Sequence, residues 1–299
     1  MMPTSNTPLL TLAELEQLQR QTLLRRHAPR RAVASPWSGA ARSIFRGRGM
    51  ELDDLRAYQA GDDVRHMDWR ATARSGRPMT KVFREERQRL LYLLVDRGPA
   101  MHFGTRVETK ATTAARVAAI LAFSALAQQE QVAGLVLDGR RERAYAAARR
   151  LDGVLPILRA ACAAPGADHR DAADWPAVWD DLRRNVNRGT TVCVISDLLG
   201  VDDGQRAQLW RLAAQCEVIF FQIIDPAEEH LPDAGRLRLT AGDGRIHLID
   251  TGDKTLRQRY AAAMAERATA LRRLCDNTGI RLQPVYTHRD AFSQMREAL

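Results

Sequence analysis

The stretch Leu90-Leu91-Tyr92-Leu93-Leu94-Val95-Asp96 decides the fold class, together with a second stretch of the same kind, Thr191-Val192-Cys193-Val194-Ile195-Ser196-Asp197. Each is a short apolar run that ends on an aspartate, and such runs are typical of strands buried on both faces of a parallel sheet. A third run, Val218 to Ile224, is followed by Asp225 in the same way. Helical patterns separate the runs, so the sequence predicts an α/β fold with a doubly wound, mostly parallel sheet.

The aspartates mark one edge of the predicted sheet. In open α/β sheets the ligand crevice lies beyond the carboxyl ends of the strands, so we expect Asp96 and Asp197 at the functional edge. Paired carboxylates suit a hard cation such as magnesium. The residues after Asp96, Arg97-Gly98-Pro99-Ala100-Met101, carry no side-chain oxygen and add a guanidinium. The site therefore has the position of a metal site without most of its ligands. No cofactor is expected, magnesium being the one alternative, and Arg97 is a candidate to replace the cation by pairing with either aspartate.

The composition is that of an ordinary soluble globular protein. The chain has 299 residues, of which 45% are hydrophobic and 27% charged. Its longest apolar stretch, Val117 to Ala127, is shorter than the roughly 20 residues of a membrane helix. The amino terminus lacks the pattern of a secretory signal, so a cytoplasmic location is expected. The four cysteines are widely spaced and are predicted to be buried free thiols.

The positive charge is concentrated in the first third of the chain. Residues 1–90 hold 17 Lys and Arg against 10 Asp and Glu, a net of +7 out of +9 for the whole chain. Phosphate binding is one interpretation and a solvated arginine-rich surface is the other. No basic recognition helix, aromatic stacking motif or zinc finger accompanies the charge, so nucleic acid is not the expected partner.

Catalytic motifs give no support to an enzyme. The chain has no phosphate loop of the Gly-x-x-x-x-Gly-Lys-Ser/Thr type, no Gly-x-Gly-x-x-Gly after a strand, no His-Glu-x-x-His and no Gly-x-Ser-x-Gly. The seven histidines are scattered without ligand spacing. We therefore expect a non-enzymatic protein.

The sequence divides into three parts. Residues 1–42 contain a helix, opened by the capping box Thr11-Leu12-Ala13-Glu14, and a linker. Residues 43–89 are dense in Gly, Asp and Arg and are too charged to form a core alone. Residues 90–299 form the sheet domain, with a hairpin at 236–250 around Asp243-Gly244. Helices are expected near 108–129, 151–163, 173–186, 204–215 and 254–276, with further strands near 132–137, 143–147 and 281–286.

The segment from Gly47 to Arg74 carries a series of fixed spacings: Gly-x-Gly-x-Glu, Arg-x-Tyr, Gly-Asp, Arg-x-x-Asp-Trp and Ala-Arg. This series resembles the bacterial domain-of-unknown-function 58 family, and the match continues through Phe103-Gly104-Thr105 and Lys110. The signature residues are Glu51, Arg56, Tyr58, Asp62, Arg65, Asp68, Trp69 and Arg74. Alternating Arg and Asp with two aromatic residues suits either a charge-paired brace packed on the sheet or a surface that binds a partner.

The resemblance implies a von Willebrand factor A-like domain, which in many relatives holds a divalent cation in a metal-ion-dependent adhesion site. Asp96 matches the first aspartate of that site and Asp197 the last, while Gly98 and Ala100 stand where two serines belong. It also implies an association with MoxR-type AAA+ ATPases in chaperone-like assembly or maturation.

Three functions follow as hypotheses. The first is an adaptor that binds an AAA+ ATPase or its client through the carboxyl edge of the sheet, with Arg97, Met101, His102 and Leu198 as candidate contacts. The second is a protein binder that depends on a divalent cation held by the two aspartates. The third is nucleic-acid binding through the basic first third.

Overall fold

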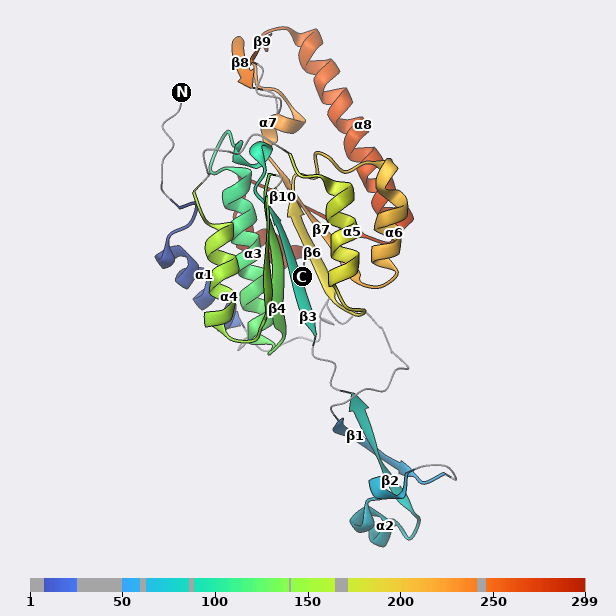
Figure 1. Cartoon of the computed structure of the whole chain (residues 1–299). Helices are drawn as coiled ribbons and strands as arrows, with labels where there is room; N and C mark the ends of the chain where they lie inside the picture. Colours follow the sequence, from blue (N-terminus) through green and yellow to red (C-terminus); the bar gives the residue numbers. More distant parts are fainter. Residues whose placement is uncertain are drawn as a thin grey trace. The chain divides into compact units, whose positions relative to one another are not determined.

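The structure is a computed structural model, and it describes residues 8–25, 50–59, 63–85, 89–139, 141–164, 172–240 and 246–298. The chain forms two compact units, one of residues 1–33 together with 89–299 and the other of residues 34–88. The larger contains the central sheet and is called the sheet unit; the smaller is called the signature unit (Figure 1).

The central sheet of the sheet unit has six strands in the order β10-β7-β6-β3-β4-β5. All neighbouring strands are parallel except β4 and β5, which are antiparallel. The strands are β3 (Leu90–Asp96), β4 (Gln131–Asp138), β5 (Arg141–Ala148), β6 (Thr191–Ser196), β7 (Glu217–Ile224) and β10 (Arg281–Tyr286). The predicted mixed α/β fold with a mostly parallel sheet is confirmed, and the arrangement is compatible with the doubly wound class.

Helices cover both faces of this sheet (Figure 1). On one face lie α1 (Leu12–Arg25), α3 (Lys110–Ala127), α4 (Leu151–Ala161) and α9 (Ala291–Ala298). On the other lie α5 (Trp175–Asn185), α6 (Arg206–Ala213) and the long α8 (Lys254–Thr278). Short elements complete the sheet unit: α7 (Pro226–Glu229) and the hairpin of β8 (Arg236–Thr240) and β9 (Ile246–Asp250), whose turn lies outside the described residues.

Successive side chains of a strand point to opposite faces of the sheet, and in the buried strands both sets are apolar, so both faces need a helical layer. Tyr92 and Leu94 of β3 pack with α5, α6 and α8, while the intervening Leu91, Leu93 and Val95 are buried as well. A strand that is apolar on both faces is stable only between two layers. The four cysteines are buried and free, as expected from their apolar surroundings.

Helix α3 is both long and apolar. It is an 18-residue helix with a mean hydropathy of 1.3, so its length and composition would allow it to cross a membrane. In this structure most of it is buried, and it contacts β3, β4, α1 and α4. It therefore serves here as the core helix of the sheet unit.

The N-terminal helix belongs to the sheet unit, so the predicted boundary at residue 42 does not separate it from the sheet domain. The capping box is confirmed, because the Thr11 backbone N–H donates to Glu14 over 2.8 Å and the Glu14 backbone N–H donates to the Thr11 hydroxyl over 3.3 Å. Leu15 and Leu18 are buried, and Glu14 pairs with Arg116 of α3 at 2.8 Å. Apolar contacts and an ion pair thus fix α1 on α3.

The two edges of the central sheet differ in sequence from its centre. At one edge, β5 carries exposed Glu142 and Arg143. At the other, β10 contains Pro284, which has no backbone N–H to donate. Charged residues and proline are common in edge strands of natural sheets.

The signature unit consists of a hairpin and a short helix. Strand β1 (Met50–Ala57) pairs antiparallel with β2 (Met79–Glu85), and α2 (Trp69–Ser75) lies between them in sequence. Asp68 caps α2 by accepting from the backbone N–H groups of Arg70 and Ala71. Gly76 ends it with φ +66°, a left-handed conformation that glycine adopts without strain. The expectation that this segment packs on the sheet stays a prediction.

Candidate functional site at the carboxyl edge of the sheet

The carboxyl ends of β3 and β6 meet at the point where the strand order reverses. The chain leaves β3 through α3 to reach β4 on one side, whereas β6 lies on the other side of β3. In open α/β sheets this is where ligands bind. Asp96 ends β3 and Asp197 directly follows β6, so the structure brings both predicted aspartates to this point.

Asp96 is held by hydrogen bonds from its neighbours. Its Oδ1 accepts from the Gly98 backbone N–H at 2.7 Å, and its Oδ2 accepts from the Ser196 hydroxyl at 2.6 Å. The Ser196 oxygen in turn accepts from the Leu198 backbone N–H at 3.0 Å. Burial, followed by the charge of Asp197, raises the pKa of Asp96 to about 6.

A lysine lies beside the second aspartate. The Lys110 Nζ donates to Asp197 Oδ2 at 2.7 Å and also bonds Glu228 Oε1. The Lys110 side chain has no exposed surface, and those of Asp197 and Glu228 are 6% and 26% exposed. Burial opposes the charge of Lys110, but the two carboxylates outweigh it and raise the pKa of the ammonium. The site therefore contains an internal cation.

A third carboxylate ties the neighbouring loops together. Asp225, after β7, accepts from the Thr105 hydroxyl at 2.5 Å, from the Thr105 N–H at 2.9 Å and from the Thr287 hydroxyl at 2.8 Å. These bonds lower the pKa of Asp225 despite its burial. Asp225 also caps α7 and thereby positions Glu228, whose Oε2 accepts from the Asp225 N–H.

The oxygen atoms of this site do not fit the coordination that magnesium requires. Magnesium requires near-octahedral oxygen ligands. Here Asp96 is occupied by Ser196 and Gly98, Asp197 by Lys110 and the Leu199 N–H, and Gly98 and Ala100 offer no side-chain oxygen. Among the described residues, no group of three His, Cys, Asp or Glu side chains is arranged to hold a metal ion. The alternative of a weak magnesium site at Asp96 and Asp197 thus has no support in this geometry.

Arg97 does not replace the cation, so that prediction is wrong. Its guanidinium donates to the carbonyl oxygens of Ala160 at 3.0 Å, in the last turn of α4, and of Ala163 at 2.6 Å, just past the end of that helix. The oxygens at a helix C-terminus lack intrahelical partners and attract cations. Arg97 therefore holds α4 against the end of β3.

Three of the four candidate partner contacts are buried. Met101 and Leu198 have no exposed surface and Arg97 is 3% exposed, so none of them offers a contact in this structure. His102 is half-buried. The exposed apolar side chains of this edge are their neighbours Phe103, Val107 and Leu199, which are 38%, 74% and 44% exposed. We call these three residues the apolar rim.

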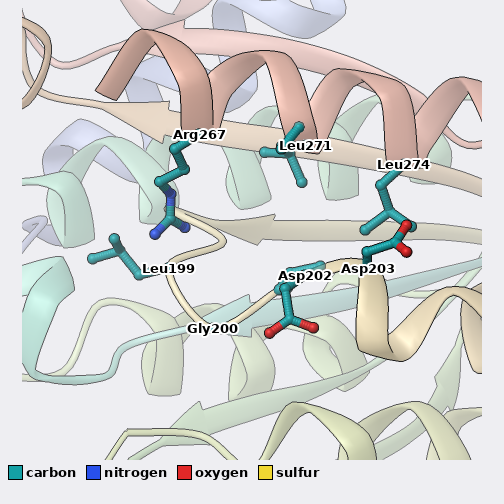
Figure 2. A pocket seen from close by; sticks show the side chains of 9 residues that line it. Leu199, Gly200, Asp202, Asp203, Arg267, Leu271 and Leu274 are labelled. Atoms are coloured by element: carbon teal, nitrogen blue, oxygen red, sulfur yellow. The ribbon is translucent and has the colours of Figure 1, made fainter. Parts of the chain in front are cut away.

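A small cleft lies between the loop after β6 and helix α8 (Figure 2). Its volume is about 220 Å³, and Arg267, Leu271 and Leu274 of α8 face Leu199 and Asp202 of the loop across it. The Arg267 guanidinium donates to the Leu198 carbonyl oxygen at 2.7 Å. Leu198 has a positive φ of 57°, which is uncommon for a non-glycine residue, and this bond helps to hold it.

The signature residues lie in the other unit, where several of them make local contacts. Arg65 pairs with Asp63 at 2.8 Å, but Asp68 serves as the cap of α2. Trp69 is 67% exposed, and Arg74 is exposed on the same helix. The Arg56 guanidinium, in β1, donates to the Ala57 carbonyl oxygen, and the Tyr58 backbone N–H donates to the Pro78 carbonyl oxygen. Glu51 pairs with Arg84 through the backbone ladder of β1 and β2. Asp62 lies outside the described residues.

Sequence comparison identifies relatives across most of the chain. The sequence model of a family described as "Protein of unknown function DUF58" matches residues 54–270. Uncharacterized proteins of Mycobacterium bovis and Mycobacterium tuberculosis are each 30% identical over 247 residues, covering 83% of this chain and 78% of theirs. An uncharacterized protein of Mycobacterium avium is 31% identical over 134 residues, covering 45% of this chain and 79% of its own.

Solved structures are more distant. A conserved hypothetical protein BatB from Bacteroides thetaiotaomicron has a TM-score of 0.41 at 12% identity, covering 70% of this chain and 95% of its own. An aerotolerance-related membrane protein from Bacteroides fragilis has a TM-score of 0.39 at 12% identity, covering 70% and 96%. At these scores the similarities carry no argument about function.

Proposed function

The chain belongs to the DUF58 family of proteins of unknown function, and from that premise we propose that it is a non-enzymatic adaptor that binds a protein partner through the carboxyl edge of its sheet. The partner that the family resemblance favours is a MoxR-type AAA+ ATPase or its client, in a chaperone-like assembly or maturation role. The observation that carries the proposal is the combination of a closed polar site with the exposed apolar rim around it.

The strand order supports a von Willebrand factor A-like assignment for the sheet unit. The order β10-β7-β6-β3-β4-β5, with a single antiparallel edge strand, places Asp96 at the end of a central strand and Asp197 at the end of its neighbour. Those are the positions that the resemblance gives to the first and last aspartates of an adhesion site.

The polar groups of the site support binding rather than catalysis. Asp96, Lys110 and Asp197 are buried and bond one another or nearby backbone groups. A general base or nucleophile must reach the reacting atom of a substrate. These groups instead fix the loops that display the apolar rim.

The rim supplies the kind of surface that a partner can bury. Phe103 and Val107 come from the loop after β3, and Leu199 comes from the loop after β6. Large apolar side chains that a partner covers on binding lose their contact with water, which favours association. We expect such residues at the centre of the contact to contribute most of the affinity.

A pull-down with the purified MoxR-type ATPase of the same organism tests the proposal. The substitution Val107→Asp places a charge in the rim and is expected to lower the retained ATPase by about tenfold or more. Leu24→Asp is the matched control, because Leu24 is 75% exposed and Val107 is 74% exposed, but Leu24 lies on α1. Failure of the unchanged protein to retain the ATPase, or equal losses for both variants, would contradict the proposal.

A further inference from the structure

Lys110 occupies a place that its own local structure makes unfavourable for a cation. It is the first residue of α3, where the helix dipole is positive, and its side chain is fully buried. An ammonium in such a place is costly unless carboxylates compensate for it. Asp197 and Glu228 provide that compensation, and both lie far from Lys110 in sequence, in the loop after β6 and in α7.

The same lysine connects three loops. Its backbone N–H donates to the Phe103 carbonyl at 2.9 Å, within the loop after β3. Its side chain reaches Asp197 after β6 and Glu228 in α7, which follows β7. A divalent cation bound by carboxylates from neighbouring loops would connect them in the same way.

We infer that the Lys110 ammonium is a permanent internal counter-ion that takes the place of a divalent cation, so that the carboxyl edge keeps its arrangement without metal. The charges agree with this role, because a second cation beside Lys110 would meet repulsion and would need oxygens that already accept hydrogen bonds. The consequence for partner binding, that it is insensitive to chelators, rests on the proposed function. The structural role of Lys110 is independent of the proposed function.

Thermal unfolding of the full chain tests the inference without any partner. The midpoint of the unchanged protein is expected to move by less than about 1 °C between about 1 mM EDTA and about 10 mM magnesium, manganese or calcium chloride. A rise of several degrees with any of these cations would show a functioning divalent site and overturn the inference.

Substitution of the lysine provides the second arm. Lys110→Met keeps much of the side-chain volume but leaves two carboxylates without their cation, so the midpoint should fall by roughly 6 to 20 °C. Lys254→Met is the control, since Lys254 is an exposed lysine at the start of α8. Equal midpoints for these two variants would overturn the inference.

A charge-neutral variant keeps the test decisive if Lys110→Met does not fold. In Lys110→Met/Asp197→Asn/Glu228→Gln neutral amides replace the two carboxylates, so no counter-ion is needed. At least about half of the decrease in thermal midpoint caused by Lys110→Met should then be recovered. If the triple variant is no more stable than Lys110→Met, the lysine acts through packing alone and the counter-ion role is rejected. Because no partner is present, these results are independent of the pull-down.

Discussion

Asp96 lies between groups with opposite effects on its charge. Burial and the neighbouring Asp197 favour the protonated acid, whereas hydrogen bonds from Ser196 and Gly98 and the charge of Lys110 favour the carboxylate. The first effects are larger, and the pKa of Asp96 is raised from 3.8 to about 6. Folding therefore imposes a cost on this residue wherever the unfolded chain has already lost the proton.

This cost predicts a pH dependence that Asp96→Asn removes. Because the folded-state pKa is raised, the contribution of Asp96 to stability is most favourable below about pH 4 and is lost as the pH rises to about 6. Relative to the unchanged protein, Asp96→Asn should gain about 2 kcal/mol of unfolding free energy between pH 4 and pH 7. Urea unfolding across this range measures the difference.

The control for this prediction is Asp152→Asn, because the Asp152 side chain is 79% exposed. Its pH profile of stability should differ from that of the unchanged protein much less than the profile of Asp96→Asn does, because interactions of an exposed charge are weak. Parallel profiles for Asp96→Asn and the unchanged protein would mean that Asp96 is as ionised in the folded state as in the unfolded chain.

The residues of the site were only partly predictable from sequence. Asp96 and Asp197 follow apolar strands, so their position at the carboxyl edge could be expected from the pattern alone. The identity of the cation beside them could not be predicted, because Arg97 is the cationic residue adjacent in sequence, whereas Lys110 reaches the site only through the turn that starts α3. Thr105 and Lys110 already belong to the family resemblance, but their contacts with Asp225, Asp197 and Glu228 became visible only with the fold.

At the scale of elements, the approach of α4 to β4 depends on the absence of a side chain. A Cβ on Gly134 would lie 2.3 Å from the Leu93 carbonyl oxygen and 2.3 Å from Ile157 Cδ1. Neither distance is compatible with normal packing, so a larger residue must displace the helix or distort the strand.

Gly134→Ala is therefore expected to lower the unfolding free energy by about 1 to 3 kcal/mol, even though alanine generally suits a strand at least as well as glycine. Ile157→Val removes the Cδ1 methyl group from the contact, so the double variant should lose less than the sum of the two single losses. Chemical denaturation of the three variants forms the cycle. Strict additivity would show that the helix does not press on position 134.

The elements themselves were largely predictable, because their patterns are local. The expected helix at 108–129 is α3, and the expected strand at 132–137 is β4, each within two residues of its observed ends. The segment 43–89 was harder, since its hairpin and α2 rest on turns and caps such as Asp68 and Gly76 rather than on apolar periodicity. Its exposed Trp69 could not be anticipated from composition.

For the whole molecule, the division into two units has a consequence that can be tested. The sheet unit includes α1 from before residue 34 and everything from Arg89 onward. The signature unit is thus inserted between two parts of a single compact unit. Sequence could not show this, because the contact of α1 with α3 depends on residues about 100 positions apart, Glu14 and Arg116.

Replacement of residues 34–88 by a flexible Gly/Ser linker of about 20 residues should leave a cooperatively folding sheet unit, with a thermal midpoint within about 3 °C of the full chain. Removal of residues 1–33 should instead lower the midpoint clearly, because it uncovers the surface of α3 on which Leu15 and Leu18 pack. Circular dichroism melting compares the two deletions. A larger loss from the first deletion would contradict the division.

The edges of the central sheet have a further consequence for the fate of the chain. Exposed strand edges can recruit other chains into continuous sheets, which is a common route to aggregation. Here Glu142 and Arg143 on β5 place charges along one edge, and Pro284 on β10 removes a donor from the other. Both edges are therefore poor templates for a foreign strand. The central sheets of crowded copies should therefore resist edge-to-edge pairing, including during synthesis, when neighbouring chains are close together.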